Sequence, residues 1–208
     1  EEPLAAAIGV GIDITQPCGS MVIDMGGGTT DIAVISLGGI VHSASIRIAG
    51  DTFDEAIIKY IRRKYNILVG ERTAEELKTK LGCVSKRPKL LAMEVRGRSL
   101  ISGLPKTLQV TSDEMYEAMS EVSGTIVDSV KNVLEETPPE LVSDISNRGI
   151  ILTGGGATMY GFGELIRSQT GIKTVIASEP DECVAQGTGK ALENISLLKT
   201  YNERRAAR

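Results

Sequence analysis

A glycine-rich turn between two apolar runs constrains this chain more than any other feature. Residues 21–34 read Met-Val-Ile-Asp-Met-Gly-Gly-Gly-Thr-Thr-Asp-Ile-Ala-Val, which is typical of a strand, a turn and a second strand. Three consecutive glycines tolerate positive φ angles and let a ligand approach the backbone closely. Successive backbone N–H groups in such a turn form an anion-binding concavity, and the hydroxyls of Thr29 and Thr30 add donors. The turn therefore predicts a phosphate site.

Asp24, at the end of the first of these strands, adds a metal ion to this hypothesis. An isolated carboxylate repels phosphate unless a divalent cation lies between the two groups. The combination of Asp24 with the glycines that follow therefore predicts a site for a metal ion and a phosphate group. The stretch is not a Walker A loop, because no Gly-Lys-Ser/Thr follows, and it is not a dinucleotide fingerprint, because the next element is a strand. A glycine-rich β-hairpin without a ligand is the alternative interpretation.

Composition and charge exclude other classes of function. The chain has 208 residues, of which 41% are hydrophobic and 24% are charged, as in ordinary soluble domains. A chain of this length forms one large domain or two small lobes, and it buries roughly 70% of its unfolded surface. The net charge of −4 argues against a nucleic-acid partner.

The cysteines and the histidine do not support disulfide, zinc or histidine chemistry. Cys18, Cys83 and Cys183 are scattered and lack Cys-x-x-Cys spacing, which fits a reducing cytoplasm. The only histidine, His42, lies in a strand-like stretch, and we interpret it as structural. We find no signal peptide and no apolar run of 18 residues. The chain begins inside an apolar helix pattern without an initiator methionine, so we expect a fragment.

Turn residues and hydrophobic periodicity predict alternating strands and helices along the chain. The predicted strands cover 20–25, 31–37, 40–48, 91–98, 104–110, 149–153 and 172–177, with Gly38-Gly39 as a hairpin turn. The predicted helices lie near 3–12, 50–64, 73–82, 111–134, 138–147, 162–170 and 181–198. Capping boxes of Thr73 with Glu76 and of Thr111 with Glu114 begin two of them. A stripe that includes Met115 and Met119 places the longest helix against the core.

A second glycine turn, at residues 154–157, follows the buried strand 149–153. A helix comes next, so we expect these glycines at a helix N-terminus. The strands that lead into the two turns are predicted to be neighbours in one sheet, and ligands of open α/β sheets bind at the carboxyl ends of strands. One turn then holds phosphate, and the other gives backbone access to a flat or sugar-like group. The order of elements predicts an α/β fold.

With both turns placed, the chain resembles the actin–heat-shock-70–sugar-kinase ATPase superfamily, and within it the MreB family of bacterial actins. The blocks that carry the resemblance span nearly the whole chain: 23–36, 49–58, 70–76, 95–98, 103–105, 137–141 and 152–157. The first and last blocks occur throughout the superfamily, and the middle blocks are similar to MreB in particular. The resemblance implies an actin-like, ribonuclease H-like α/β lobe with a smaller α+β insert.

The resemblance also implies that this chain is the second lobe only. Its core would comprise residues 1–48 and 112–208, with a hinge helix and a closing helix, and residues 49–111 would form the inserted subdomain. MreB-like proteins carry, before this region, a first lobe with another phosphate loop and the membrane-binding segments. We therefore expect weak nucleotide binding and inefficient ATP hydrolysis from this chain alone.

By the same resemblance, the site binds ATP and Mg²⁺. Asp24 matches the carboxylate that holds Mg²⁺ through water, and Glu2 and Thr29 match positions that orient the attacking water. Residues that match nucleotide contacts are Gly26, Gly27, Gly28, Thr29, Thr30, Glu75, Glu76, Lys78, Gly154, Gly155, Gly156, Ala157 and Met159, with Tyr160 as a second residue beside the base. Asp31 departs from the pattern, since many MreB sequences have Glu there.

Most of these residues also have an ordinary structural interpretation. Glu2 fits a charge favoured at a helix N-terminus, and Glu1 could take its catalytic role. The charged residues of the predicted helix 73–82 fit a solvated face. The second glycine turn fits a tight strand–helix connection, and Met159 fits packing. Only Asp24 with its glycine turn favours a functional site without the resemblance.

The resemblance implies an ATP-dependent, filament-forming bacterial actin that scaffolds cell-wall synthesis and maintains rod shape. Its partners would be further filament subunits and cell-wall elongation proteins, with no nucleic acid. Its place would be the cytoplasmic face of the cell membrane, reached through regions absent from this chain. Two alternatives stay open: the ATPase lobe of a heat-shock-70-type chaperone, and a non-enzymatic docking domain.

Overall fold

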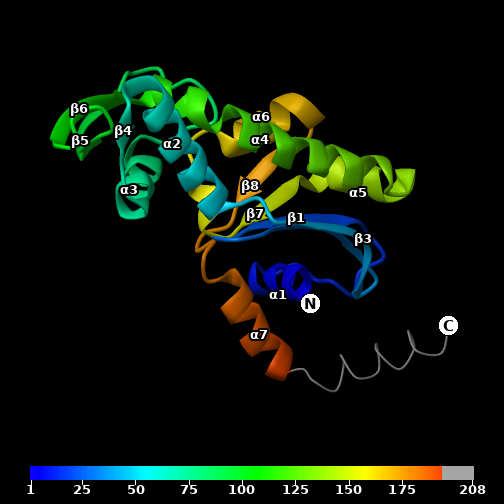
Figure 1. Cartoon of the computed structure of the whole chain (residues 1–208). Coiled ribbons are helices and arrows are strands. Elements are labelled where there is room, and N and C mark those ends of the chain that lie inside the picture. The colour runs from blue at the N-terminus through cyan, green and yellow to red at the C-terminus, as the bar shows by residue number, and fades with distance from the viewer. Residues whose placement is uncertain (194–208) are drawn as a thin grey trace.

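The computed structural model describes residues 1–193 and contains two β-sheets with helices packed around them (Figure 1). The strands are β1 (Ser20–Met25), β2 (Thr30–Ser36), β3 (Gly39–Ile46), β4 (Ile67–Leu68), β5 (Ala92–Ser99), β6 (Pro105–Thr111), β7 (Ile150–Thr153) and β8 (Thr174–Ile176). The α-helices are α1 (Glu2–Gly9), α2 (Gly50–Tyr65), α3 (Glu71–Leu81), α4 (Ser112–Glu135), α5 (Pro139–Arg148), α6 (Phe162–Thr170) and α7 (Cys183–Glu193), and η1 (Gly155–Thr158) is a 3₁₀ helix.

The larger sheet has five strands in the order β3-β2-β1-β7-β8. Strand β1 pairs antiparallel with β2 and parallel with β7, and β7 pairs parallel with β8. Helix α1 covers one face of this sheet, and α4, α5 and α6 cover the other (Figure 1). A mixed sheet between two helical layers confirms the predicted α/β class.

Strand β1 is buried along its whole length because both faces of the sheet are covered. Met21, Ile23 and Met25 belong to the main core, whereas Val22 belongs to a second cluster with residues of α1. Side chains alternate between the two faces of a strand, so Asp24 falls on the same face as Val22, toward α1. The strand therefore places the candidate metal carboxylate beside the N-terminal helix.

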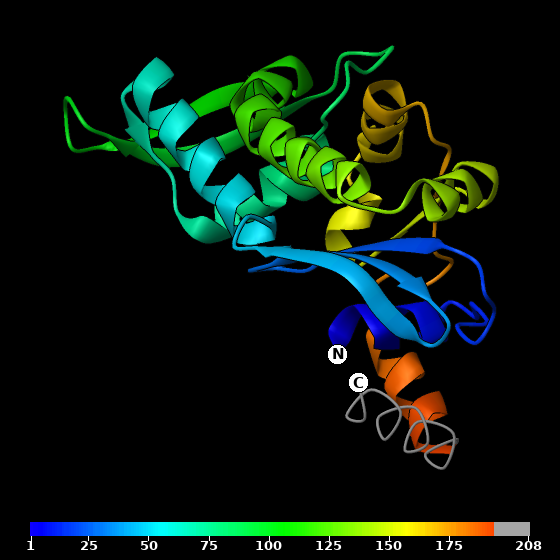
Figure 2. The ribbon, with the colours of Figure 1, turned by 90° about the vertical axis from the view of Figure 1, so that its right-hand side faces the viewer.

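A smaller antiparallel sheet, in the order β4-β5-β6, lies within residues 67–111. Figure 2 shows it to the left of the central sheet, with α2 running from one sheet toward the other. One hydrophobic cluster contains residues of β1, α2, α3, α4, β5 and β6. The domain boundaries at 48/49 and 111/112 therefore stay a prediction, since buried side chains pack across them.

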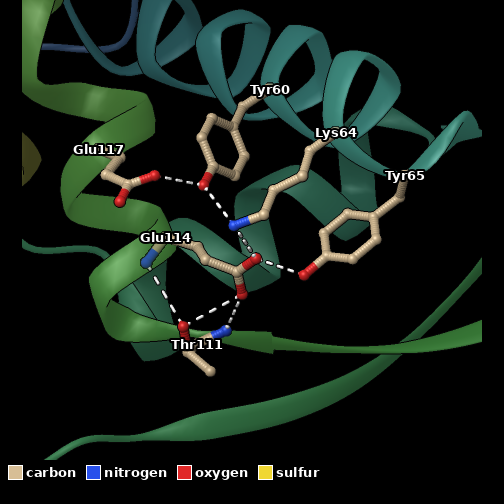
Figure 3. Close-up of polar contacts among 6 residues, drawn as sticks. All are labelled: Tyr60, Lys64, Tyr65, Thr111, Glu114 and Glu117. Carbon is tan, nitrogen blue, oxygen red and sulfur yellow. Dashed lines mark hydrogen bonds and ion pairs between the residues drawn. The ribbon is translucent and has the colours of Figure 1, made fainter.

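A polar cluster joins the end of α2 to the start of α4 (Figure 3). Tyr60 donates a 2.6 Å hydrogen bond to the Glu117 carboxylate. Lys64 lies 3.0 Å from the Tyr60 hydroxyl and 2.9 Å from the Glu114 carboxylate, which also accepts a hydrogen bond from Tyr65. Burial raises the pKa of Glu114, but the hydrogen bonds from Tyr65 and Lys64 outweigh burial and hold that pKa below its usual value. The cluster ties the inserted segment to the long helix.

One of the two predicted capping boxes is confirmed and the other is wrong. At the start of α4, the Glu114 N–H donates to the Thr111 hydroxyl at 3.4 Å, and the Thr111 N–H donates to the Glu114 carboxylate at 2.8 Å. Helix α3 begins at Glu71 instead of residue 73, and its N-cap is Gly70, which has no side chain to cap with. The Gly70 carbonyl accepts from the Thr73 N–H, so Thr73 already lies inside the first turn.

Two turns also differ from the predictions. The β2–β3 hairpin turns at Leu37 and Gly38, whose φ angles of 50° and 79° are both in the left-handed region, and Gly39 already belongs to β3. The second glycine turn does not begin helix α6. Its residues form the short helix η1, and α6 starts only after Gly161, an N-cap with a φ of 85°. A positive φ at that position interrupts any continuous helix from the turn.

The core position expected for the methionine stripe is confirmed. Met115 and Met119 are fully buried, and all three cysteines are free. The His42 ring lies 2.8 Å from the Glu136 carboxylate, a contact between β3 and the end of α4. Helix α7 begins at Cys183 instead of residue 181, and the predicted part beyond residue 193 lies outside the described residues. Within residues 1–193, no helix combines the length and the apolar character needed to cross a bilayer.

Candidate functional site

The two glycine turns lie side by side because β1 and β7 are paired. In the parallel register, Asp24 is opposite Thr153, so both strands end at the same edge of the sheet. Gly154 has a φ of 79°, and a Cβ at this position would lie 2.3 Å from the Met25 carbonyl oxygen. Real Cβ atoms do not approach so closely, so glycine is required here. The two turns are therefore neighbours, as the sequence predicts.

The first turn is fastened to the start of α2. The Gly26 N–H donates to the Thr29 carbonyl at 2.9 Å, which closes the turn. The carbonyls of Gly26 and Gly27 accept from the N–H groups of Gly50 and Asp51 at 3.2 and 2.8 Å. These two carbonyls point toward the N-terminus of α2. Gly26, Gly27 and Gly28 are exposed, so the other side of the turn faces solvent. Such a turn is suited to bind an anion through its amides.

A cavity of about 510 Å³ lies between the two turns and α3. Seven of the predicted nucleotide contacts line it: Gly26, Gly27, Glu75, Lys78, Gly155, Gly156 and Met159. Tyr160, the second residue expected beside the base, lines it as well. Three separate segments of the chain thus meet around one cavity large enough for a small ligand. Their role in binding stays a prediction.

The other predicted contacts are not brought to the cavity wall. The Thr30 side chain is fully buried, and its hydroxyl donates to the Ile48 carbonyl at 2.7 Å. Ala157 is fully buried, and Glu76 is exposed with its carboxylate 3.7 Å from Lys80. Gly28, Thr29 and Gly154 flank the lining residues without being part of the wall. Of these, Thr30 and Ala157 hold the turns in shape, and the structure gives Glu76 no contact with the cavity.

Lys78 is not part of the solvated helix face that the alternative interpretation expects. Its ammonium lies 2.6 Å from the Asp54 carboxylate and donates to the Gly50 carbonyl at 3.0 Å. Both side chains are largely buried. Burial raises the pKa of Asp54, although Lys78 opposes this shift through its hydrogen bond and charge. Lys78 therefore joins α3 to the start of α2 beside the first glycine turn.

Asp24 is buried, with only 5% of its surface exposed, and its surroundings shift the pKa of its carboxyl group. Burial raises the pKa of its carboxyl group, and the charges of Glu2 and Asp31 add to the rise. The Thr153 hydroxyl donates to Asp24 Oδ1 at 2.9 Å, which acts in the opposite direction. Burial and the neighbouring negative charges destabilise the ionised form of this carboxyl group. A cation bound beside it would stabilise that form.

The residues around Asp24 fit a magnesium ion that takes most of its ligands from water and phosphate. Within the described part of the chain, no three His, Cys, Asp or Glu side chains gather into a metal-binding group. Mg²⁺ is commonly held by one or two carboxylates together with substrate phosphates and water. A single carboxylate near a turn that is predicted to bind phosphate meets that requirement. Glu2 is close enough to act on the pKa of Asp24, so the two candidate acidic residues lie on one side of the sheet.

Sequence reasoning missed several residues of the cavity: Gly50, Thr79, Gly82, Arg87 and Thr158. Gly50 and Thr79 lie within predicted helices and could be found from the helix positions. Arg87 lies in the stretch 83–90, which the sequence describes only as a polar, basic loop. Its place at the cavity depends on the pairing of Cys83 with Tyr160, which no local pattern reveals.

A comparison with known protein families decides the family of the chain. The model of the MreB/Mbl protein family matches residues 1–200. The chain belongs to the MreB/Mbl family. This confirms the resemblance on which the expectations for the site depend.

MreB/Mbl proteins of several bacteria are similar to nearly all of this chain. The cell shape-determining proteins Mbl of Bacillus cereus and MreB of Escherichia coli are 52% and 51% identical to it. Each match covers 95% of this chain, and 60% and 57% of those two relatives. The chain thus spans less than two thirds of the length of these relatives.

Solved MreB structures share the fold. A crystal structure of MreB5 of Spiroplasma citri bound to ADP is 42% identical, with a TM-score of 0.91 over 94% of this chain and 59% of that one. A second structure of MreB5, bound to AMPPNP, is 41% identical with a TM-score of 0.92 over 97% of this chain and 61% of that one. These matches confirm the actin-like α/β lobe.

Proposed function

We propose that this chain is the nucleotide-binding lobe of an ATP-dependent, filament-forming bacterial actin that determines cell shape. The observation that carries the proposal is the meeting of both glycine turns at one cavity of about 510 Å³. Similarity to MreB5 proteins that bind ADP and AMPPNP supports a nucleotide as the ligand. Similarity to proteins named for determining cell shape supports the cellular role.

In this proposal each turn binds a different part of the nucleotide. The Gly26 N–H already closes the turn on the Thr29 carbonyl, so the amides of Gly27 and Gly28 would bind phosphate oxygens, as consecutive backbone N–H groups do in anion-binding nests. Gly155 and Gly156, which present only backbone, leave space for the sugar and base. Glu75 and Met159 line the same cavity and would contact the nucleoside.

Acidic residues on the α1 face of the sheet would take part in ATP hydrolysis. Asp24 would hold Mg²⁺, which when bound neutralises charge on the phosphates. Glu2 and Thr29 would orient the attacking water, and Glu2 is a carboxylate able to polarise it. Phosphoryl transfer depends mainly on such positioning and charge stabilisation. The family of this chain favours this proposal over a heat-shock-70-type chaperone lobe or a docking domain.

The proposal extends to the place and partners of the protein in the cell. We infer that the parent protein is cytoskeletal and acts in the cytoplasm at the inner face of the membrane. There it would assemble with further copies of itself and with cell-wall elongation proteins. Residues 1–48 and 112–208 would form its core lobe, and residues 49–111 would form the inserted subdomain.

Equilibrium dialysis of the 208-residue chain against ADP with Mg²⁺ tests the nucleotide site. We expect saturable binding that is weaker than about 1 μM, because the chain carries only one of the two phosphate loops expected for the family. Gly27→Glu is a suitable control variant, since it places a negative side chain in the phosphate turn and should abolish binding. Sub-micromolar affinity would contradict the expected division of the site, and no binding at millimolar ADP would contradict the site itself.

A further inference from the structure

The tip of the β5–β6 hairpin exposes three large aliphatic side chains to which the proposed function gives no role. Leu100, Ile101 and Leu104 are 43%, 85% and 66% exposed. They lie within five consecutive residues of one tight turn, so they form a single patch. The hairpin projects from the small sheet, and its tip lies at the far left of Figure 2. Exposed apolar side chains that gather in one place mark a surface that contacts a partner or a membrane.

Hydrogen bonds fix the backbone of the tip. The Ser99 N–H donates to the Leu104 carbonyl at 2.9 Å, and the Gly103 N–H donates to the Ser99 carbonyl at 2.9 Å. The Ser99 hydroxyl accepts from two further N–H groups of the turn, at 3.3 and 3.2 Å. The Leu100 N–H donates to the Asn66 carbonyl at 2.8 Å, which fastens the tip to the end of α2. The apolar patch is therefore held out from the sheet in a defined shape.

The strands beside the tip are basic. Arg96, Arg98 and Lys106 are exposed, and residues 95–111 contain no Asp or Glu. Within residues 1–193, none of these three side chains takes part in an ion pair. This segment carries a charge of +3, and the whole chain carries −4, so the other residues carry −7. The hairpin thus combines an apolar tip with adjacent positive charge, on a body that is acidic.

We propose that the β5–β6 hairpin inserts its tip into the surface of an anionic lipid bilayer. Leu100, Ile101 and Leu104 enter the boundary between the headgroups and the acyl chains, where the burial of apolar area is favourable. Arg96 and Arg98 remain at the level of the anionic headgroups, which attract them. The same surface repels the acidic body, so the molecule is oriented with the hairpin toward the lipid.

A bilayer fits this tip better than a protein partner does. A specific protein interface takes about 20–30 residues from each side, whereas the tip is a narrow turn with three apolar side chains. A bilayer has no fixed shape to match, so a few aliphatic side chains with neighbouring cations are sufficient. This contact would be additional to the membrane-binding segments that the family resemblance places outside this chain. It does not depend on the nucleotide site.

Vesicle flotation of the 208-residue chain tests the contact. We expect binding to phosphatidylcholine vesicles that contain phosphatidylglycerol, weaker binding to phosphatidylcholine alone, and loss of the difference at high salt. Ile101→Ser combined with Leu104→Ser should weaken binding at least about tenfold, because most of the apolar area is lost. Arg98→Gln should weaken binding to the anionic vesicles about fivefold and leave binding to phosphatidylcholine unchanged. Val41→Ser, at an exposed apolar residue of β3, is the control and should change neither.

A single tryptophan then locates the contact, since the chain contains none. The emission of the Ile101→Trp variant should shift to shorter wavelength when anionic vesicles are added, and soluble quenchers should lose access to it. The Val41→Trp variant carries the same probe on β3 and should show neither change.

The outcomes separate a membrane contact from its alternatives. Failure of the unchanged chain to bind anionic vesicles would overturn the proposal. Binding that survives the combined serine variant, or that leaves the Ile101→Trp emission unchanged, would overturn it too, because another surface would then bind the lipid. Sedimentation velocity detects the other partner: self-association that the serine variant abolishes, without vesicle binding, would assign the tip to a second copy of the chain. A chain that binds vesicles but no ADP would contradict the proposed nucleotide site and support the hairpin contact.

Discussion

At the scale of single residues, the most informative group is the carboxylate of Asp24. It is buried, the charges of Glu2 and Asp31 add to the rise in its pKa, and the hydrogen bond from the Thr153 hydroxyl opposes that rise. A carboxyl group whose pKa is raised in the folded state stabilises the fold at low pH and loses that contribution as the pH rises. The ionised form is therefore tolerated at a cost in stability, which is common at sites that bind a ligand.

Asp24→Asn should raise the melting temperature of the ligand-free chain at pH 7, because the variant has no charge to bury. For the unchanged chain, the contribution of Asp24 is fully present below about pH 4 and is lost as the pH rises through the raised pKa. The variant should lack this fall. Thermal unfolding with EDTA, measured between pH 4 and pH 8, reports both quantities. In the parent protein, the same change should weaken Mg²⁺-dependent ATP hydrolysis.

Asp13→Asn is the matched control for this experiment. Asp13 is exposed, and hydrogen bonds from Thr15 and Gln16 lower its pKa, so its effect on stability has the opposite sign. We expect Asp13→Asn to lower the melting temperature slightly at pH 7. If Asp24→Asn lowered it as well, the electrostatic account of Asp24 would be wrong. Unchanged ATP turnover in the parent protein would remove Asp24 from the site.

At the scale of elements, the site depends on how closely the second glycine turn packs against the end of β1. Gly154 lies against the Met25 backbone and the Asp24 carboxylate, and a Cβ would come within 2.3 and 2.7 Å of them. The parallel pairing of β1 with β7 sets this distance. The shortest contact is with the Met25 main chain, which cannot move aside without breaking the pairing.

Gly154→Ala should destabilise the chain by about 2–4 kcal/mol, because it adds a positive-φ penalty to a backbone clash. Gly155→Ala is the matched control, since Gly155 has no atom within 4 Å of an added Cβ and no positive φ. Its free energy of unfolding should change by less than about 0.5 kcal/mol. Urea denaturation of both variants gives the two values. Similar losses in both would mean that the turns are not packed as described.

At the scale of the whole molecule, the chain is a lobe whose first and last described helices lie together. Helices α1 and α7 cross below the central sheet (Figure 1), where Gly9 and Gly187 allow the backbones to touch. A Cβ on Gly187 would lie 1.7 Å from the Ala5 carbonyl oxygen. Close packing of α1 on α7 therefore joins the two ends of the described chain.

The parent protein, with a first lobe joined to this one, should form filaments with ATP. Filament growth would place copies of this lobe end to end. Negative-stain electron microscopy with ATP and with no nucleotide tests this expectation, and the Asp24→Asn protein is a useful comparison. Absence of filaments or sheets under every nucleotide condition would count heavily against the bacterial actin proposal.

Local sequence was sufficient to predict most of the strands, the helices and the first glycine turn. Their signals lie in short stretches: the apolar run into Asp24, the Thr111–Glu114 capping box and the glycines at 26–28. The helix start at Glu71 was predicted wrongly, because a glycine N-cap leaves no side-chain signal. The two candidate contacts Thr30 and Ala157 were placed in the right turns, but the sequence could not show that they are buried.

The sequence by itself determined the fold class, the family and the positions of the two glycine turns, since each follows from patterns within short stretches of the chain. Only the tertiary structure decided which residues face the cavity. The ion pair of Lys78 with Asp54, the acidic surroundings of Asp24 and the stacking of Arg87 on Tyr160 all join segments that are distant in sequence. Such contacts depend on how sheets and helices pack, and packing is a property of the whole chain rather than of any local pattern.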